Sequence, residues 1–280
     1  MKKRSLSGSI LIAIAALTLL FQSCITAGAE SGTITITGTG SSIGTMQRLV
    51  EVYRKKNPGI DINVLSSIGS TGGIKAVKAN RIDIGLSARA LRPEERFSEL
   101  SEVAYGRTPF VFATHRSNKQ SSITLAEVAK IYAGQQLAWP DRTPVRLVLR
   151  PMTDAYTVFL EGLNENIKQA SRKSYRIPGL FTGVTDQDAA DQIEKTTGAF
   201  GVTSLSLILS EGRNVKILSL DGVVPDVANL ESGKYPYFMT MYLVYRKSNP
   251  AVRRFIDFVF SREGQKVLRD CGHVPLKKAL

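Results

Sequence analysis

Hydrophobic and polar positions along the chain predict short strands, each followed by a polar loop and a helix. Residues 33–37 alternate hydroxyl and apolar side chains, as a half-buried strand does. Apolar residues then recur at helical spacing from Met46 to Tyr53, until Asn57-Pro58-Gly59 ends the pattern. The scheme continues with predicted strands at 60–65, 82–86, 110–114, 145–149, 198–202, 215–218 and 239–245, and predicted helices at 74–79, 125–132, 157–163 and 250–268. Because both halves follow this scheme, we expect an α/β fold of two lobes with a ligand cleft between them.

Three predicted strands in succession end in loops that carry hydroxyl groups or an arginine. The loops are Thr39-Gly40-Ser41-Ser42-Ile43-Gly44, Gly69-Ser70-Thr71-Gly72-Gly73 and Ser87-Ala88-Arg89. Ligands gather at the carboxyl ends of strands in open α/β sheets, so these loops are expected to share one crevice. The second loop would expose backbone N–H groups at a helix start, where they can hold an anion without a charged side chain. An ordinary strand-to-helix turn could have the same residues, so both interpretations stay open.

In the second half, the predicted strand at 145–149 leads directly into Arg150. A guanidinium at a strand end could bind an oxyanion through its planar set of donors. The alternative is a surface arginine that pairs with Asp154.

Composition adds few constraints on function. The 280 residues are 43% hydrophobic and carry a formal net charge of +13, which indicates a globular chain long enough for a large core. Lys and Arg are spread along the sequence, and no nucleic-acid motif is evident, so no nucleic-acid partner is expected. A diffuse positive charge could attract small anions or anionic membranes, but it more often reflects general surface chemistry.

The N-terminal segment predicts export. Lys2, Lys3 and Arg4 precede an apolar run at 10–21 that is too short for an ordinary spanning helix, so residues 1–29 read as a signal peptide. Cleavage after Ala27-Gly28-Ala29 would give a mature chain that starts at Glu30. A competing cut before Cys24 would leave a lipid anchor, so the protein is expected in the periplasm or secreted, with anchoring through Cys24 as the alternative.

Catalytic and metal-binding patterns are not evident in the sequence. His115 and His273 lie far apart, without a cluster of ligands at metal-binding spacing, so neither a metal nor a cofactor is expected. A hydrolase such as a phosphatase would need an acid and a base, for which Asp83 and Asp154 are candidates only if the fold positions them. We therefore expect a binding protein that is not an enzyme.

The chain resembles the periplasmic phosphate-binding proteins of phosphate ABC transporters, the PstS-like branch of two-lobed solute-binding proteins. The resemblance extends from about Thr33 to the C-terminus. It rests on an ordered set of motifs: Thr37-Gly38-Thr39-Gly40-Ser41-Ser42, Gly69-Ser70-Thr71-Gly72-Gly73-Ile74-Lys75, Asp83-Ile84-Gly85-Leu86-Ser87-Ala88-Arg89, Gly198-Ala199-Phe200-Gly201, Ser232-Gly233-Lys234-Tyr235-Pro236 and Ser261-Arg262-Glu263-Gly264-Gln265-Lys266. It implies a type II periplasmic-binding-protein fold with lobe 1 at 30–107 and 238–280 and lobe 2 at 108–237. Closure is then expected at crossings near 107–113 and 237–243.

The resemblance also implies a set of ligand-binding positions. The candidate site residues are Ser41, Ser42, Ile43, Ser70, Thr71, Gly72, Ser87, Arg89, Arg150, Thr153, Asp154 and Tyr156. Two departures from the family pattern stand out. Ala88 occupies the position where the family has a carboxylate or hydroxyl, and Thr153-Asp154-Ala155-Tyr156 replaces a Gly-Ser-Gly-Thr loop.

Asp154 would bring a negative charge to the loop that touches the ligand. At about 4 Å, two like charges repel by roughly 4 kcal/mol at an intermediate dielectric. Asp154 could accept a hydrogen bond from a protonated phosphate and so replace the acceptor that is absent at Ala88. Alternatively it pairs with Arg150 or Arg89, and the cleft binds weakly, binds something else or has lost transport function.

The expected function is that of a monomeric periplasmic solute-binding protein. It would capture a small oxyanion, phosphate according to the resemblance, and deliver it to a membrane ABC permease. The alternative is a divergent family member with altered or lost anion binding that acts as a sensory or protein-interaction module.

Overall fold

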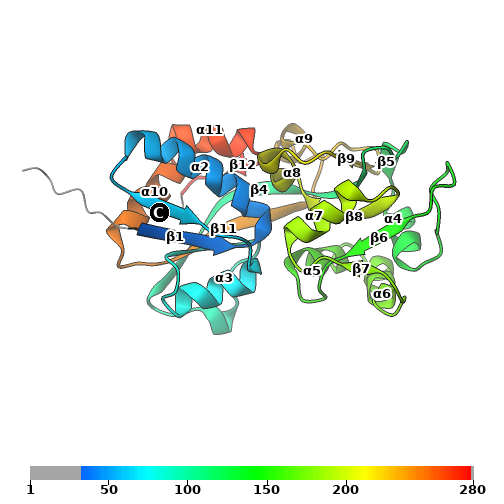
Figure 1. The fold of residues 1–280 in the computed structure, drawn as a ribbon, viewed down its shortest axis with the longest axis horizontal. Coiled ribbons are helices and arrows are strands. Elements are labelled where there is room, and N and C mark those ends of the chain that lie inside the picture. The colour runs from blue at the N-terminus through cyan, green and yellow to red at the C-terminus, as the bar shows by residue number, and fades with distance from the viewer. Residues whose placement is uncertain (1–32, 279–280) are drawn as a thin grey trace, which may run out of the picture.

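The computed structural model describes residues 33–278, in which a mixed sheet of ten strands runs the length of the molecule (Figure 1). The strand order is β2-β1-β3-β11-β4-β8-β6-β7, and β9 and β12 also pair with β4. A separate small sheet joins β5 to β10. The strands are β1 Thr33–Gly38, β2 Asp61–Val64, β3 Ile84–Ser87, β4 Leu100–His115, β5 Ser122–Ile123, β6 Arg146–Leu149, β7 Phe181–Thr182, β8 Ala199–Ser204, β9 Val215–Ile217, β10 Ser219–Leu220, β11 Phe238–Arg246 and β12 Val274–Pro275.

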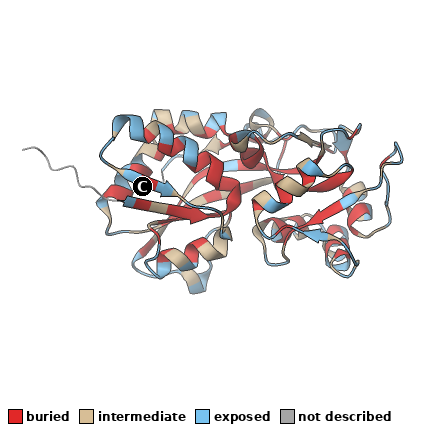
Figure 2. Cartoon of the chain, in the orientation of Figure 1, coloured by how far each residue is buried: buried red, intermediate tan, exposed pale blue. Residues whose placement is uncertain are grey.

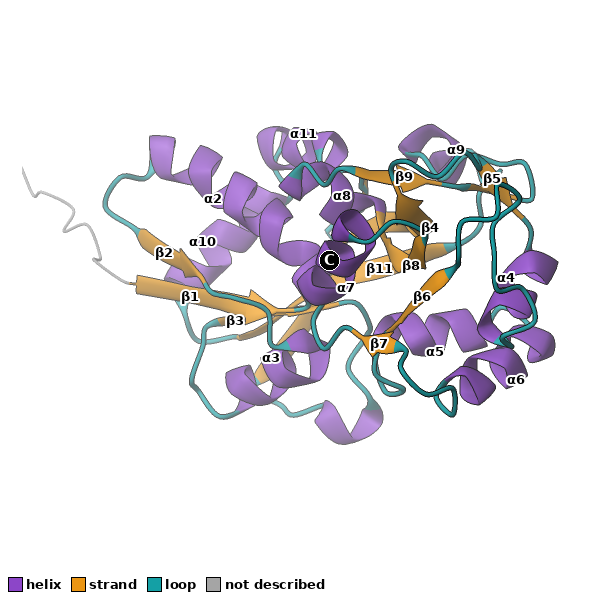
Figure 3. Cartoon of the chain, turned by 45° about the vertical axis from the view of Figure 1, so that its right-hand side comes forward, coloured by secondary structure: helices purple, strands orange, loops and turns teal. Residues whose placement is uncertain are grey.

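Helices cover both sides of this sheet. The α-helices are α2 Ile43–Lys56, α3 Gly69–Lys78, α4 Leu125–Tyr132, α5 Ala155–Glu161, α6 Glu165–Ser174, α7 Asp186–Lys195, α8 Leu205–Glu211, α9 Val227–Glu231, α10 Pro250–Val259 and α11 Arg262–Asp270, with short 3₁₀ turns η1 Gly40–Ser42 and η2 Pro93–Glu95. At the end of the molecule that contains β1, helices α2, α10 and α11 lie on one side of the sheet and α3 on the other (Figures 1 and 3). The described fold is therefore the mixed α/β architecture that the sequence predicts.

The first strand shows how local patterning builds the sheet. Ile34 and Ile36 are buried, whereas Thr33 is exposed, as the alternation predicts. β1 pairs in parallel with both β2 and β3, so these three strands end at the same edge of the sheet. At that edge, a Cβ at Gly38 would lie 2.1 Å from the Leu86 carbonyl oxygen, and only glycine permits this approach.

Strand β4 links the two groups of strands. Its residues 100–109 pair with β11, and its residues 110–114 pair with β8. The change of partner coincides with the start of β11, where the Phe110 amide donates to the Tyr237 carbonyl oxygen at 3.0 Å. Figure 2 shows that this central part of the sheet is mostly buried. The sequence predicted only the segment 110–114 as a strand, because polar and charged residues at 100–109 obscure the alternation.

Two helix predictions differ from the structure. The expected single helix at 250–268 is broken after Val259, and Ser261 caps a second helix by accepting from the Gly264 amide at 3.1 Å. A Cβ at Gly264 would lie 2.2 Å from the Phe258 carbonyl oxygen, so glycine permits this tight corner. Helix α3 begins at Gly69 and not near Ile74, so the predicted anion loop forms the first turn of the helix itself.

Several expectations fall on parts of the chain outside the described residues. The signal peptide at 1–29 and the Cys24 anchor lie there, and both stay predictions. Among residues 33–278, no helix has the length and apolar character needed to cross a bilayer.

Candidate functional site

The loops that follow β1, β2 and β3 meet at one edge of the sheet. The Thr39 amide donates to the Leu86 carbonyl oxygen at 2.9 Å, which joins the first loop to the end of β3. The Gly38 carbonyl oxygen accepts from the Ile68 amide at 3.1 Å and from the Ser67 hydroxyl at 2.9 Å. These contacts bring the three loops together, although whether they bind a ligand stays a prediction.

Hydroxyl groups of the second and third loops bond within the protein. Ser70 Oγ accepts from the Ala88 amide at 3.0 Å. Ser87 is buried, and its hydroxyl donates to the Arg89 carbonyl oxygen at 2.6 Å. Gly72 lies in the first turn of α3, where an added Cβ would lie 3.2 Å from the Ile68 side chain. The hydrogen bonds of Ser70 and Ser87 therefore stabilise this edge of the sheet.

Arg89 is engaged within its own lobe. Its guanidinium makes two hydrogen bonds to the Glu95 carboxylate, at 2.6 and 2.7 Å, and a third to Thr71 Oγ1 at 3.2 Å. The hydrogen bond from Arg89 lowers the pKa of Glu95 to about 2, against the opposing effect of burial. An external anion would have to compete with this carboxylate for Arg89.

Arg150 lies at the end of β6 and is only 4% exposed. Its Nη2 donates to Asp154 Oδ2 at 2.9 Å, and its Nη1 donates to the Gly183 carbonyl oxygen at 3.0 Å. The pairing with Asp154 left open by the sequence is thus present, but the arginine is buried and not on the surface. Asp154 also caps α5 by accepting from the Tyr156 amide at 3.0 Å.

A second carboxylate, that of Asp186, also faces Arg150, and it is not among the residues predicted from the sequence. Asp186 opens α7, is 6% exposed, and places Oδ1 3.4 Å from Arg150 Nη2. Its Oδ2 accepts from the Ser41 amide and from the Thr39 hydroxyl, each at 3.2 Å. Asp186 therefore connects the loop after β1 to Arg150 across the two lobes. The Thr185-x-x-Asp188 capping box signals the start of this helix in the sequence, but not what lies opposite Asp186.

Charges around Arg150 do not balance. Burial lowers the pKa of Arg150, but the charges of Asp186 and Asp154 outweigh burial and raise it, so the guanidinium stays protonated. Burial, followed by the charge of Asp186, raises the pKa of Asp154 against the opposing effect of Arg150. One cation faces two carboxylates, which gives a formal charge of −1 when both are ionised.

The other predicted residues of the second lobe differ in their exposure. Thr153 is exposed, whereas Tyr156 is buried and its ring stacks against Phe110 with the centroids 5.8 Å apart. Burial and the charge of Asp186 raise the pKa of the Tyr156 phenol. The side chains of Ser204 and Ser41 lie near its buried hydroxyl and oppose this increase.

Ser41 and Ser42 are also buried. Ser42 Oγ accepts from the Tyr105 hydroxyl at 2.8 Å, and Ser41 Oγ lies 3.0 Å from Thr39 Oγ1. The Ser41 carbonyl oxygen accepts from Ser206 Oγ at 3.1 Å, which adds another bond between the lobes. The first loop thus has its hydroxyls satisfied internally, and its Ser41 amide points at Asp186.

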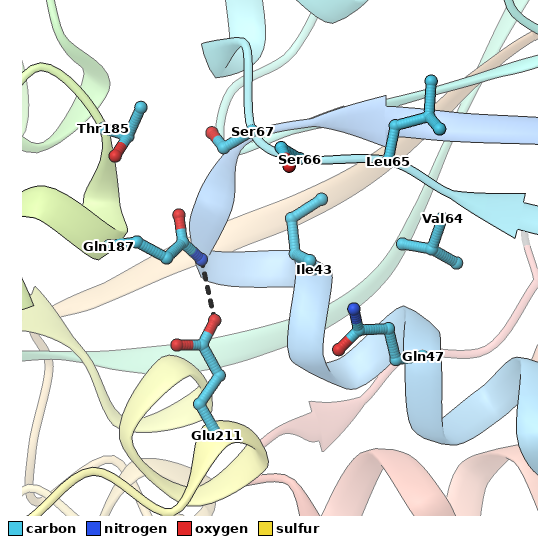
Figure 4. Close-up of a pocket in the computed structure, with 9 residues that line it drawn as sticks. All are labelled: Ile43, Gln47, Val64, Leu65, Ser66, Ser67, Thr185, Gln187 and Glu211. Carbon is cyan, nitrogen blue, oxygen red and sulfur yellow. Dashed lines mark hydrogen bonds between the residues drawn. The ribbon is translucent and has the colours of Figure 1, made fainter.

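Thr185 and Gln187, the two sequence neighbours of Asp186, line an open groove of about 400 Å³ (Figure 4). Ile43 is the one predicted site residue that lines it; the other lining residues are Gln47, Val64, Leu65, Ser66, Ser67, Thr185, Gln187 and Glu211. Gln187 Nε2 donates to Glu211 Oε1 at 2.7 Å and to the Gly40 carbonyl oxygen at 3.0 Å. The groove therefore adjoins the Asp186 contact, but Arg150 does not line it.

His115 Nδ1 lies 2.7 Å from Ser117 Oγ. Within residues 33–278, no group of three or more His, Cys, Asp or Glu side chains could hold a metal ion. His273 is buried against Tyr105, with Nε2 3.2 Å from Thr45 Oγ1, and burial lowers its pKa to about 3. Cys271 is buried as well.

Comparisons with known proteins identify the family. A family model described as a PBP superfamily domain matches residues 26–263. Protein SphX of Synechococcus elongatus is 26% identical over 96% of this chain and 85% of that protein. Phosphate-binding protein PstS 2 of Streptococcus pneumoniae is 36% identical, but the match spans 39% of this chain and 37% of that protein.

A solved structure agrees with the fold. The phosphate ABC transporter substrate-binding protein of Clostridium perfringens, determined with bound phosphate, has a TM-score of 0.75 and 22% sequence identity. The alignment covers 88% of this chain and all of that one (100%). The chain therefore belongs to the PBP superfamily, and its relatives there are the PstS-like proteins that the sequence motifs indicate.

Proposed function

We propose that this protein is an extracytoplasmic solute-binding protein that captures a small oxyanion, with phosphate as the first candidate, for an ABC permease. The names of two similar proteins, PstS 2 of Streptococcus pneumoniae and the Clostridium perfringens protein, support phosphate as that candidate. The lobe boundaries at 107/108 and 237/238 belong to the proposal, supported by the change of strand partner along β4. Periplasmic location and a monomeric state are further parts of it.

One observation carries the proposal. A buried guanidinium, a backbone amide and a hydroxyl converge on one carboxylate, that of Asp186, between the two lobes. A carboxylate is an oxyanion, and charge-assisted donors that accept one suit another of similar shape. The Ser41 amide also lies where the helix dipole of the following α2 favours negative charge. These donors form a cradle, which we define as Thr39, Ser41 and Arg150.

Calorimetry tests the proposal directly. Phosphate, sulfate and arsenate are titrated separately into purified mature protein, and heat is expected with phosphate. Absence of heat with all three anions would contradict the transport function.

A second function is favoured by a specific observation. Asp154 and Asp186 both neutralise Arg150, which would weaken an anion site. In that case the protein would keep the fold as a sensory or protein-interaction module. The calorimetric result separates the two functions, because only the solute-binding protein needs the anion.

We also propose that the protein is not an enzyme. Asp83, one of the two acid–base candidates, accepts from the Thr35 amide at 2.8 Å and serves the sheet. The other, Asp154, caps a helix and pairs with Arg150. Turnover of a generic phosphoester by the purified protein would overturn this part of the proposal.

A further inference from the structure

We infer that Asp186 is an internal ligand of the cradle, which holds the lobes together and which a solute anion has to displace. The effect of Asp186 on anion affinity rests on the proposed function. Its effect on lobe closure rests on the geometry alone. It makes Asp186 a residue that determines which anions can bind, in addition to the residues that would contact them.

The position of the carboxylate is the first argument. The Asp186 Oδ2 accepts hydrogen bonds from the Ser41 amide and the Thr39 hydroxyl, and its Oδ1 faces Arg150. Those three donors are the ones a bound oxyanion would use. An external anion cannot reach them while Asp186 is in place, because the Asp186 oxygens already occupy these donors and the anion would be a third negative charge beside one buried cation.

The second argument is that the contact joins segments far apart in the chain. Asp186 and Ser41 are separated by 145 positions and belong to α7 and to the loop after β1. Next to them, Gln187 Nε2 donates to the Gly40 carbonyl oxygen at 3.0 Å. A Cβ at Gly40 would lie 2.8 Å from the Asp186 Cβ, so the two segments touch without space for any larger residue. The pair Asp186–Gln187 thus clamps α7 onto the first loop.

The third argument concerns specificity. When a solute anion displaces the Asp186 carboxylate from the cradle, the carboxylate stays attached to α7. It then competes with the solute for the same donors at a high effective concentration. An incoming anion therefore has to make more or better hydrogen bonds than a carboxylate does. A tetrahedral oxyanion with four oxygens meets this condition, whereas a simple carboxylate such as acetate does not.

Two substitutions test the inference. Asp186→Asn removes the charge with little change in size, and Asp186→Ala removes the side-chain contacts. Asp188→Asn is the matched control, because Asp188 lies on the same helix, is exposed and touches no residue of the cradle, and asparagine keeps an oxygen that can accept from the Thr185 amide. Circular dichroism establishes folding, and Asp186→Asn alone serves if the alanine variant does not fold.

Inorganic phosphate is titrated into each protein, and small-angle X-ray scattering gives the radius of gyration without ligand. We expect at least tenfold tighter phosphate binding for Asp186→Asn, no change for Asp188→Asn, and a larger radius of gyration when Asp186 is substituted. Acetate should give no heat with the unsubstituted protein.

The possible results separate this inference from the proposed function. An affinity for phosphate that is equal or weaker in Asp186→Asn overturns the displacement. If neither protein binds phosphate, the proposed function fails and scattering decides the inference: a larger radius in the variant supports the clamp, and an unchanged radius overturns it.

Discussion

Substitution of Asp154 by serine tests the electrostatics of the cradle most directly. Asp154 Oδ2 lies 2.9 Å from Arg150 Nη2, so its charge acts both on that guanidinium and on any anion bound there. Serine keeps an N-cap oxygen for the Tyr156 amide, so the cost to α5 should be only a few tenths of a kcal/mol. The substitution therefore changes charge far more than local structure.

The expected gain in affinity follows from the distance. Two like charges about 4 Å apart repel by roughly 4 kcal/mol at an effective dielectric of about 20. Part of this is offset, because removing Asp154 also strengthens the hold of Asp186 on Arg150. We expect a net gain of about 1–3 kcal/mol, which corresponds to roughly fivefold to 150-fold tighter phosphate binding. The free energy of unfolding should fall by about 1–3 kcal/mol, because the buried Arg150 loses one of its hydrogen-bond partners.

Calorimetry with phosphate at several pH values measures the effect, with urea unfolding for stability. Since the pKa of Asp154 is raised, its carboxyl becomes protonated at a higher pH than an ordinary aspartate. The advantage of Asp154→Ser should therefore be greatest at pH values well above this pKa and shrink as the pH falls through it. Asp141→Ser, at an exposed turn residue, is the matched control.

Two outcomes would refute this reasoning. Weaker phosphate binding, with loss of discrimination against sulfate, would make Asp154 the acceptor for a proton on phosphate. An unchanged affinity would remove Asp154 from the binding site altogether.

Three further predictions concern other parts of the same region. Arg150→Met should lower the free energy of unfolding by about 3–5 kcal/mol in urea denaturation and abolish heat with phosphate, because the buried Asp186 and the partly buried Asp154 lose their cation; unchanged stability would contradict the pairing. Glu95→Gln should reduce the loss in the free energy of unfolding that occurs as the pH falls from about 4.5 to 2. The hydrogen bond from Arg89 lowers the pKa of Glu95, so ionised Glu95 stabilises the fold above its unfolded-state pKa. This contribution disappears as Glu95 becomes protonated at lower pH. Gly40→Ala should increase the unliganded radius of gyration by scattering, since its Cβ would lie 2.8 Å from the Asp186 Cβ, and an unchanged radius would contradict that contact.

Local patterns predicted much of the fold. Alternation in Thr33–Gly38 identified a strand with Ile34 and Ile36 inward, and helical spacing identified α2 and α4. Some helix boundaries were predicted wrongly from the local pattern. Glycines suggested a loop at 69–73, but the structure places these residues at the start of helix α3, where an added Cβ at Gly73 would lie 2.9 Å from the Gly38 Cα.

Prediction of the candidate site was less complete, for a physical reason. Motif order pointed to the loops at 39–44, 69–73 and 87–89, and strand pairing does bring them to one edge. The pairing of Arg89 with Glu95 and the hydrogen bond from the Ala88 amide to Ser70 were not predictable, because these residues meet only after the loops fold back.

What the sequence by itself determined is the family, the order of strands, loops and helices, and the presence of Arg150 with Asp154 four residues later. Only the tertiary structure decided that this arginine is buried and that Asp186 shares it. Asp186 contacts Thr39 across 147 positions, a separation over which neither periodicity nor capping carries information. Such a contact exists only when the two lobes meet, so the occupant of the cradle is a property of the closed fold.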